Sequence, residues 1–179
     1  MLPTKGGTLY NYEFSNGALK TCVRLRQASE AMEKVLEKDL DERGSTPEQL
    51  DVLAVLDATQ TPPKLGQLSK YLFRKDHSTC AQLNRMWRSG IVKKARSKED
   101  QRVVGYAPTS KGKKRLGQDK KVVMDRTREI VASALSQQEL AQLDELLRKV
   151  RDRALERLGQ RAEELPESFD VARYEGMAS

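Results

Sequence analysis

The feature that most constrains this chain is a pair of short helical patterns separated by only three residues. Leu65, Leu68 and Leu72 recur at the spacing of a two-turn helix. After the turn at residues 73–75, Asp76 is a plausible N-cap for a second short helix. The predicted inner face of that helix consists of Thr79, Leu83, Met86 and Trp87. Two short helices joined by a tight turn are the pattern of a helix-turn-helix.

The segment that follows changes to strand-like periodicity. Residues 91–97 and 103–108 are short and β-prone, and they flank a charged tip at residues 98–102. A helix-turn-helix followed by a β-hairpin is a winged helix, in which the hairpin forms the wing. We therefore predict a mainly α-helical chain with a small two- or three-stranded β wing.

Longer helices are predicted on both sides of this lobe. Residues 19–40 carry apolar side chains in steps of three and four, which predicts one long amphipathic helix that Gly44 ends. Residues 46–49, Thr-Pro-Glu-Gln, combine an N-cap, a proline at the first helical position and a capping box. Thr109 caps a further long helix, and residues 136–139 begin the last one with a second capping box.

The apolar faces of the terminal helices are larger than a small winged lobe can cover. The simplest partner for them is the same helices of a second copy, arranged with twofold symmetry. The predicted organisation is an N-terminal arm (1–17), a helical dimerisation region (18–44 and 109–158), a winged helix-turn-helix DNA-binding lobe (45–108) and an acidic, partly disordered C-terminal tail (159–179).

Charge is distributed unevenly along the 179 residues. Residues 61–128 hold 19 Lys or Arg against five Asp or Glu, a net charge of +14. The rest of the chain holds 14 basic against 21 acidic residues, a net charge of −7. Solvated faces usually mix both signs, so this excess of positive charge favours a polyanionic partner. Double-stranded DNA fits best, because a slim helix can enter its major groove and the hairpin tip can reach its minor groove.

Composition excludes several classes of protein. Only 37% of the residues are hydrophobic, and the chain shows neither a spanning run of roughly 18 apolar residues nor the apolar core of a secretory signal. Cys22 and Cys80 make no disulfide framework, and the single histidine, His77, excludes a multi-histidine metal site. No catalytic motif or phosphate-binding loop is present. We expect a cytoplasmic protein that is not an enzyme and that has no cofactor, metal or membrane partner.

Residues 46–116 resemble the MarR family of multiple antibiotic resistance regulators. The matching pieces are Thr46-Pro47-Glu48-Gln49, Leu68-Ser69-Lys70-Tyr71-Leu72, Leu83-Asn84-Arg85-Met86-Trp87-Arg88-Ser89-Gly90-Ile91-Val92, and Glu99-Asp100-Gln101-Arg102 followed by Thr109-Ser110-Lys111-Gly112. The last piece is the most specific, because the family carries Asp-x-Arg in its wing and then Leu-Thr-x-x-Gly. Here Pro108 replaces the leucine.

The resemblance implies a homodimeric DNA-binding regulator, usually a repressor, that a small ligand or an oxidant releases from a pseudo-palindromic operator. Arg102 is similar to the wing arginine that enters the minor groove, and Asp100 would orient its guanidinium, while Lys98 lies at the same tip. The resemblance places the remaining DNA contacts on the second short helix, at His77, Ser78, Ala81 and Arg85.

Cys22 carries an alternative mechanism. It lies 24 positions before Thr46, as does the peroxide-sensing cysteine in one branch of the family. That branch stabilises its thiolate with tyrosines, which the aligned positions of this chain lack. Arg26, one turn away, could favour a thiolate instead. Cys22 is therefore either a redox sensor or a small packing residue, and Arg26 could alternatively bind the carboxylate of a small aromatic or anionic effector.

Two further hypotheses use the same basic surface differently. A non-specific architectural protein would bind DNA or RNA without discriminating between sequences, and a winged-helix interaction module would bind protein. For single residues the ordinary structural roles also stay open. Trp87 is more often a core residue than a stacking platform, and the cluster at residues 113–115 is either a solvated face or a phosphate contact.

Overall fold

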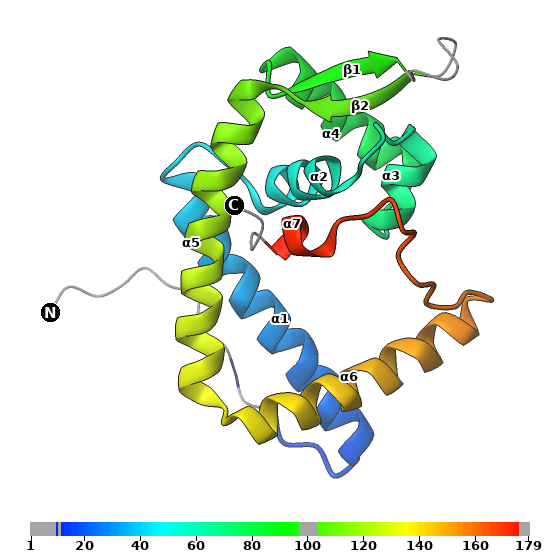
Figure 1. Cartoon of the computed structure of the whole chain (residues 1–179). Coiled ribbons are helices and arrows are strands. Elements are labelled where there is room, and N and C mark those ends of the chain that lie inside the picture. The colour runs from blue at the N-terminus through cyan, green and yellow to red at the C-terminus, as the bar shows by residue number, and fades with distance from the viewer. Residues whose placement is uncertain (1–9, 11, 97–103, 176–179) are drawn as a thin grey trace, which may run out of the picture.

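The computed structural model describes residues 10, 12–96 and 104–175 of the chain, and within them it is mainly α-helical (Figure 1). The elements are α1 (Gly17–Asp41), α2 (Pro47–Ala58), α3 (Leu65–Tyr71), α4 (Asp76–Arg88), β1 (Val92–Arg96), β2 (Val104–Pro108), α5 (Ser110–Ala134), α6 (Gln137–Arg157) and α7 (Val171–Glu175). This order confirms the predicted fold class. None of the helices in the described residues is long and apolar enough to cross a membrane.

The ends of the long helices follow the predicted caps. Thr46 Oγ1 accepts a hydrogen bond from Gln49 N, and Ser136 Oγ accepts one from Glu139 N. The Glu139 carboxylate in turn accepts a hydrogen bond from Ser136 N, which completes the second capping box. At α2 only the first half forms, because Gln49 Oε1 is buried without a hydrogen-bond partner. Gly44 follows α1 with a φ of +67°, a left-handed conformation that suits glycine.

Helix α2 lies at the centre of the winged lobe, with α3, α4 and the strands around it (Figure 1). Most of its residues are buried, which is typical of a helix enclosed on all sides. The buried residues of α2 are Leu50, Val52, Leu53, Ala54, Val55, Leu56 and Ala58. Leu68 of α3, Leu83 of α4 and Leu116 of α5 belong to the same core cluster. The lobe therefore has one core, which α2 organises.

The strands form the predicted hairpin. β1 and β2 pair antiparallel in a two-stranded sheet, with Val92 opposite Pro108 and Arg96 opposite Val104. The open edge of β2 lies against the connection from α2 to α3, because Tyr106 N donates a hydrogen bond of 3.1 Å to Pro63 O. The hairpin tip, with its predicted DNA contacts Lys98, Asp100 and Arg102, lies outside the described residues.

One detail of the helix-turn-helix differs from the prediction. Helix α4 begins at Asp76 itself, and its N-cap is Lys75. The Asp76 carboxylate then lies in the first turn, where it interacts favourably with the positive end of the helix dipole. In the turn, Phe73 has a φ of +51° and is the one non-glycine residue with positive φ in the part of the chain that the structure describes.

The C-terminal tail also differs, because part of it is folded onto the lobe. Phe169 is buried and belongs to the core cluster, and residues 171–175 form α7, which packs against α2. A single buried aromatic ring anchors this segment, and acidic composition alone did not indicate it. The prediction of a partly disordered tail is therefore wrong for residues 168–175.

Candidate nucleic-acid interface

Helix α4 has one buried and one exposed face. Thr79, Gln82, Leu83 and Met86 are buried against the lobe. The residues predicted to contact DNA are exposed, and the helical repeat places them together on the opposite face. These exposed residues are His77, Ser78, Ala81 and Arg85. The structure therefore brings the four predicted contacts of this helix onto one accessible surface.

Packing at both ends fixes the position of α4. Arg74 N donates to Ser69 O, which closes the turn from α3. At the other end Gly90 adopts a φ of +73°, and Ile91 N donates to Met86 O. Met86 and Ile91 are both fully buried, so the chain leaves α4 through the core. The exposed face of α4 is thus carried on a rigid support rather than on a loop.

Arg85 is held by its neighbour one turn earlier. Gln82 is buried, and its Oε1 accepts a hydrogen bond of 3.2 Å from Arg85 Nε and another from Arg85 Nη2. Arginine presents its donors as a planar fork, so holding one edge of the guanidinium leaves the other edge directed away. The edge that faces away carries N–H donors of the kind that can bind a phosphate or the edge of a guanine.

A shallow concavity of about 270 Å³ separates α4 from the start of α2. Its rim includes Ser78 and Arg85 from α4 together with Glu48 and Arg74. The pKa of Glu48 is lowered, first by its hydrogen bond with Thr46 and further by the charges of Arg74 and Arg85. Sequence reasoning missed Glu48 and Arg74, since no motif places the start of α2 beside α4.

Trp87 corrects another expectation. Its side chain is 52% exposed, although it was predicted to lie in the core beside Leu83. Lys94 Nζ of β1 lies 5.5 Å from the centroid of the indole ring, which is cation–π geometry. Because α4 turns by about 100° per residue, Met86 takes the buried position and Trp87 faces outward. Trp87 links the end of α4 to the wing.

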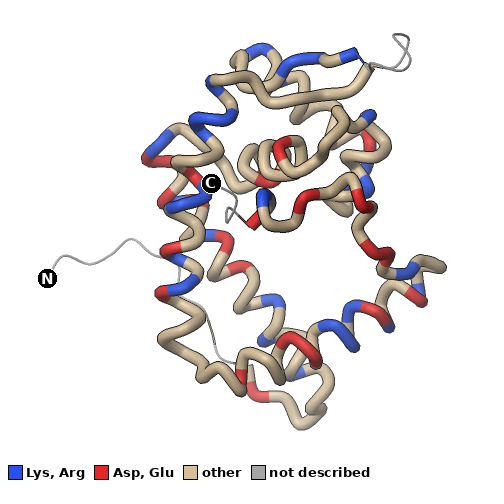
Figure 2. Tube along the Cα trace, in the orientation of Figure 1, with Lys and Arg blue, Asp and Glu red and all other residues tan. Residues whose placement is uncertain are grey.

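Lys and Arg lie on β1, near α3 and α4, and along α5 (Figure 2). Within the cluster at residues 113–115, Lys113 and Lys114 are both exposed, and Lys113 forms an ion pair of 3.6 Å with Asp57. Lys111 Nζ donates to Ser89 O at the end of α4. Part of the predicted positive charge is therefore bound to groups of the lobe itself, and other Lys and Arg residues are exposed.

The structure keeps the two cysteines apart from a metal site and from each other. Both are free thiols, and Cys22 is exposed on α1. Arg26 is also exposed and lies 3.8 Å from Glu30, one turn further along. Among the described residues no cluster of three or more His, Cys, Asp or Glu could hold a metal ion.

A second concavity, of about 390 Å³, lies between α1 and α6. Leu25 lines it from α1, and α6 contributes the other side. Arg26, the predicted effector ligand, is not among its lining residues, which are Leu25, Asp144, Leu147, Arg148, Val150, Arg151 and Ala154. This concavity belongs to the helices predicted to dimerise.

Comparison with known proteins rests on structure alone. No family model matches the chain, and no curated protein matches it. AbsC, a MarR family transcriptional regulator from Streptomyces coelicolor, superposes with a TM-score of 0.71 at 17% identity, over 80% of this chain and 98% of AbsC. MepR of S. aureus in complex with DNA gives 0.63 at 23% identity, over 77% of this chain and 97% of MepR.

A mutant MarR from E. coli complexed with operator DNA gives a TM-score of 0.66 at 22% identity, over 78% of this chain and 99% of that protein. These matches span nearly the whole length of each regulator. They confirm the fold that the sequence motifs predicted, a MarR-type winged helix. At this level of identity they concern the fold, and about a fifth of the present chain lies outside them.

Proposed function

We propose that this chain is a non-enzymatic, homodimeric regulator of transcription that binds a pseudo-palindromic DNA operator in the cytoplasm and acts as a repressor. The observation that carries the proposal is the exposed face of α4, which presents Ser78 and an oriented Arg85 near elements that carry many Lys and Arg residues (Figure 2). MepR and the mutant MarR, both solved in complex with DNA, support double-stranded DNA as the partner. The basic excess favours the same partner.

In this proposal α4 enters the major groove. His77, Ser78 and Ala81 face base edges, and Arg85 contacts a phosphate or a guanine. The wing tip reaches across the DNA backbone into the adjacent minor groove. Arg102 binds there, with Asp100 as its orienting partner and Lys98 beside it. Trp87 and Lys94 connect the two contacts, since one lies at the end of α4 and the other on β1.

Exposed apolar side chains support dimerisation through the terminal helices. No residue of α6 is buried in the single chain, and its exposed face carries Leu143, Leu146, Leu147 and Val150. Leu19 and Leu25 of α1 are exposed as well. A face of this kind is buried most simply against a second copy. A twofold dimer would then read half-sites about one helical turn apart.

For release we propose a small aromatic or anionic effector with Arg26 as a candidate ligand. The alternative is oxidation of Cys22, which its exposure on α1 favours in the single chain. Replacing Cys22 with serine separates the two mechanisms. Under the redox proposal an organic hydroperoxide releases the wild-type protein from DNA but not the variant. Under the effector proposal the hydroperoxide acts equally on both proteins.

DNA binding is tested by charge-removing variants measured by fluorescence anisotropy over a series of salt concentrations. If each subunit neutralises about four phosphates, log K falls with log salt at a slope near −7, from about 0.9 per phosphate. Arg85→Ala and Arg102→Ala should each weaken binding at least about tenfold. Arg161→Ala removes the same charge from the exposed tail and serves as the control. Equal affinities for all three variants would contradict the proposed interface.

A further inference from the structure

The C-terminal segment is attached to the winged lobe by backbone hydrogen bonds. Gln60 N donates to Ser168 O at 2.9 Å, and Asp170 N donates to Ala58 O at 2.8 Å. Between these bonds Phe169 pairs with Thr59 as an isolated antiparallel bridge. Residues 168–170 thus pair through their backbone with residues 58–60 at the end of α2. Backbone pairing with an extended segment is a recognised way to bind a short peptide.

The side chain of Phe169 anchors this attachment. Its ring centroid lies 5.6 Å from that of Tyr71 on α3, and the residue is only 8% exposed. Leu165, four residues earlier in the same tail, is 49% exposed. Burial of an aromatic ring removes a large apolar surface from water, so it stabilises the docked tail. The tail is therefore held at one defined place, beginning at Ser168.

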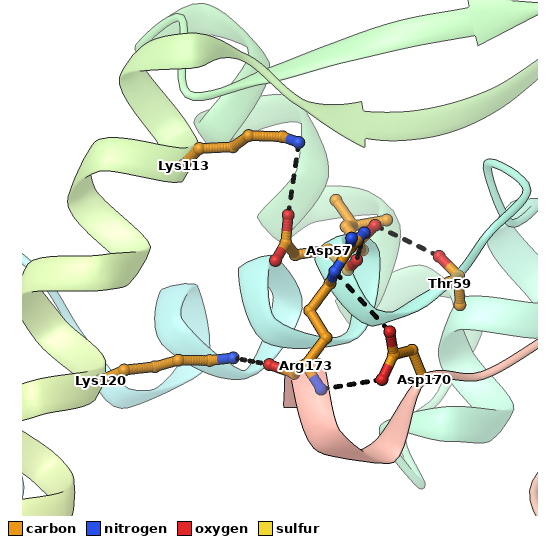
Figure 3. A network of polar contacts seen from close by, with 7 residues as sticks. Asp57, Thr59, Lys113, Lys120, Asp170 and Arg173 are labelled. Carbon is orange, nitrogen blue, oxygen red and sulfur yellow. Dashed lines mark hydrogen bonds and ion pairs between the residues drawn. The ribbon is translucent and has the colours of Figure 1, made fainter. Parts of the chain in front are cut away.

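Helix α7 extends the attachment to α5 (Figure 3). Lys120 of α5 donates a hydrogen bond from Nζ to Arg173 O, and Arg173 Nη1 donates to Asp57 O at 3.4 Å. Asp170 caps this turn by accepting from Arg173 N at 2.9 Å. Lys120 is half-buried at this junction, and its burial lowers the pKa of the ammonium group. One short segment therefore contacts α2, α3 and α5 together.

We propose that residues 168–175, which we call the strap, are a built-in peptide ligand of the winged lobe that fixes the lobe against α5. The surface that receives the strap consists of the end of α2, Tyr71 and Lys120. Its chemistry selects an aromatic residue in an extended backbone that continues into a helical turn, and the Asp170 carboxylate caps that turn within the strap itself. No DNA contact is assigned to this surface.

The strap has a consequence for DNA binding that rests on the proposed function. The lobe carries α4, and α5 leads into the helices proposed to dimerise. A docked strap therefore fixes the position of each recognition helix relative to the dimer, and a preorganised surface loses less conformational freedom on binding. Leu116 of α5 stays in the core of the lobe when the strap is released. The release removes one set of contacts between the lobe and α5, which loosens this junction and lowers the affinity for DNA.

The first part of the test measures docking without DNA, by amide hydrogen exchange of the full chain. Phe169→Ala should raise the exchange rates of the Gln60 and Asp170 amides at least about tenfold, because their acceptors move away. Leu165→Ala is the matched control, since it removes an exposed apolar residue from the same tail. Asp170→Pro keeps the ring but removes the N–H donated to Ala58 O and the carboxylate that caps Arg173 N, so exchange of the Gln60 amide in this variant keeps the test decisive if loss of the ring unfolds the lobe. Unchanged exchange in both strap variants overturns the proposal.

The second part uses a duplex that the wild-type protein selects from a random pool. The strap variants should bind it at least about fivefold more weakly than the wild type and Leu165→Ala, in line with lost preorganisation. Equal or tighter binding overturns the proposed role of the strap. Failure of the wild type to select any duplex would instead contradict the proposed function, and the exchange measurement would still decide whether the strap docks.

The third part supplies the strap in trans. A synthetic peptide with the sequence of residues 166–175 should slow the exchange of the Gln60 amide in Phe169→Ala and restore its affinity for the selected duplex. The same peptide with alanine in place of its phenylalanine should do neither. Identical effects of the two peptides would overturn the assignment of an aromatic-binding surface.

Discussion

Ser45 Oγ donates a hydrogen bond of 2.6 Å to Asp119 Oδ2, and both side chains are buried. Ser45 lies in the turn between α1 and α2, and Asp119 lies on α5, 74 positions further along the chain. Hydrogen bonds to a charged group are stronger than those between neutral groups. This contact therefore joins the start of the winged lobe to the long helix that leaves it.

Ser45→Ala should lower the free energy of unfolding by about 2 to 3 kcal/mol, because it leaves a buried carboxylate without this donor. Urea denaturation at one fixed protein concentration measures the change. Ser133→Ala is the control, since Ser133 is an exposed serine of α5 that bonds only to the carbonyl of Ile130. Equal stability of the two variants would show that the buried contact contributes nothing.

Gly112 and Gly117 of α5 should respond in opposite directions to alanine. A Cβ at Gly112 would lie 2.1 Å from Ile91 O, so Gly112→Ala must displace the backbone at the foot of the wing. A Cβ at Gly117 meets nothing within 4 Å, so Gly117→Ala should gain up to about 1 kcal/mol of helix propensity. Thermal unfolding of the two variants compares them directly. A stable Gly112→Ala protein would contradict the close approach.

Phe73 carries backbone strain in the turn of the helix-turn-helix. Its φ of +51° is costly for any residue with a Cβ, and its side chain is 69% exposed. Phe73→Gly and Phe73→Ala lose the same aromatic ring, but only glycine adopts this conformation without strain. We expect the glycine variant to be the more stable of the two by about 1 kcal/mol. An alanine variant of equal or greater stability would argue against strain at this position.

Asp51 should make stability depend on pH. Burial raises the pKa of its carboxyl group, although the charge of Arg74 acts in the opposite direction. A folded-state pKa above the unfolded one means that the ionised carboxylate is disfavoured in the folded protein. The contribution of Asp51 to the free energy of unfolding therefore becomes more favourable as pH falls through the folded pKa. The stability of Asp51→Asn relative to the wild type should therefore be higher at about pH 7 than at about pH 3. The same difference at both pH values would contradict this.

Much of the fold was predictable because its signals are local. Caps at Thr46, Thr109 and Ser136, and apolar periodicity between them, determine where the helices begin and which face they bury. The exposed face of α4 followed from the same periodicity. Glycine at position 112 was part of a sequence motif, and the structure supplies its physical reason in the approach of Ile91 O.

Contacts between elements distant in sequence were not predictable in this way. Trp87 was expected in the core, because periodicity alone does not distinguish two adjacent positions at the edge of a buried face. Glu48 enters the rim of the α4 concavity from a different helix. Phe169 is a lone aromatic residue in an acidic tail, and its partner Tyr71 lies almost 100 positions earlier, so no local pattern marks the pair.

The most direct test of the central claim is selection of duplexes from a random pool by the full-length protein, followed by footprinting of the winner. We predict enrichment of one pseudo-palindromic site, a twofold-symmetric footprint with half-sites about one helical turn apart, and an affinity at least about 10³-fold above that for unselected duplex at physiological salt. An affinity ratio near one, with no enriched sequence, would contradict sequence-specific recognition and leave only a non-specific nucleic-acid-binding protein.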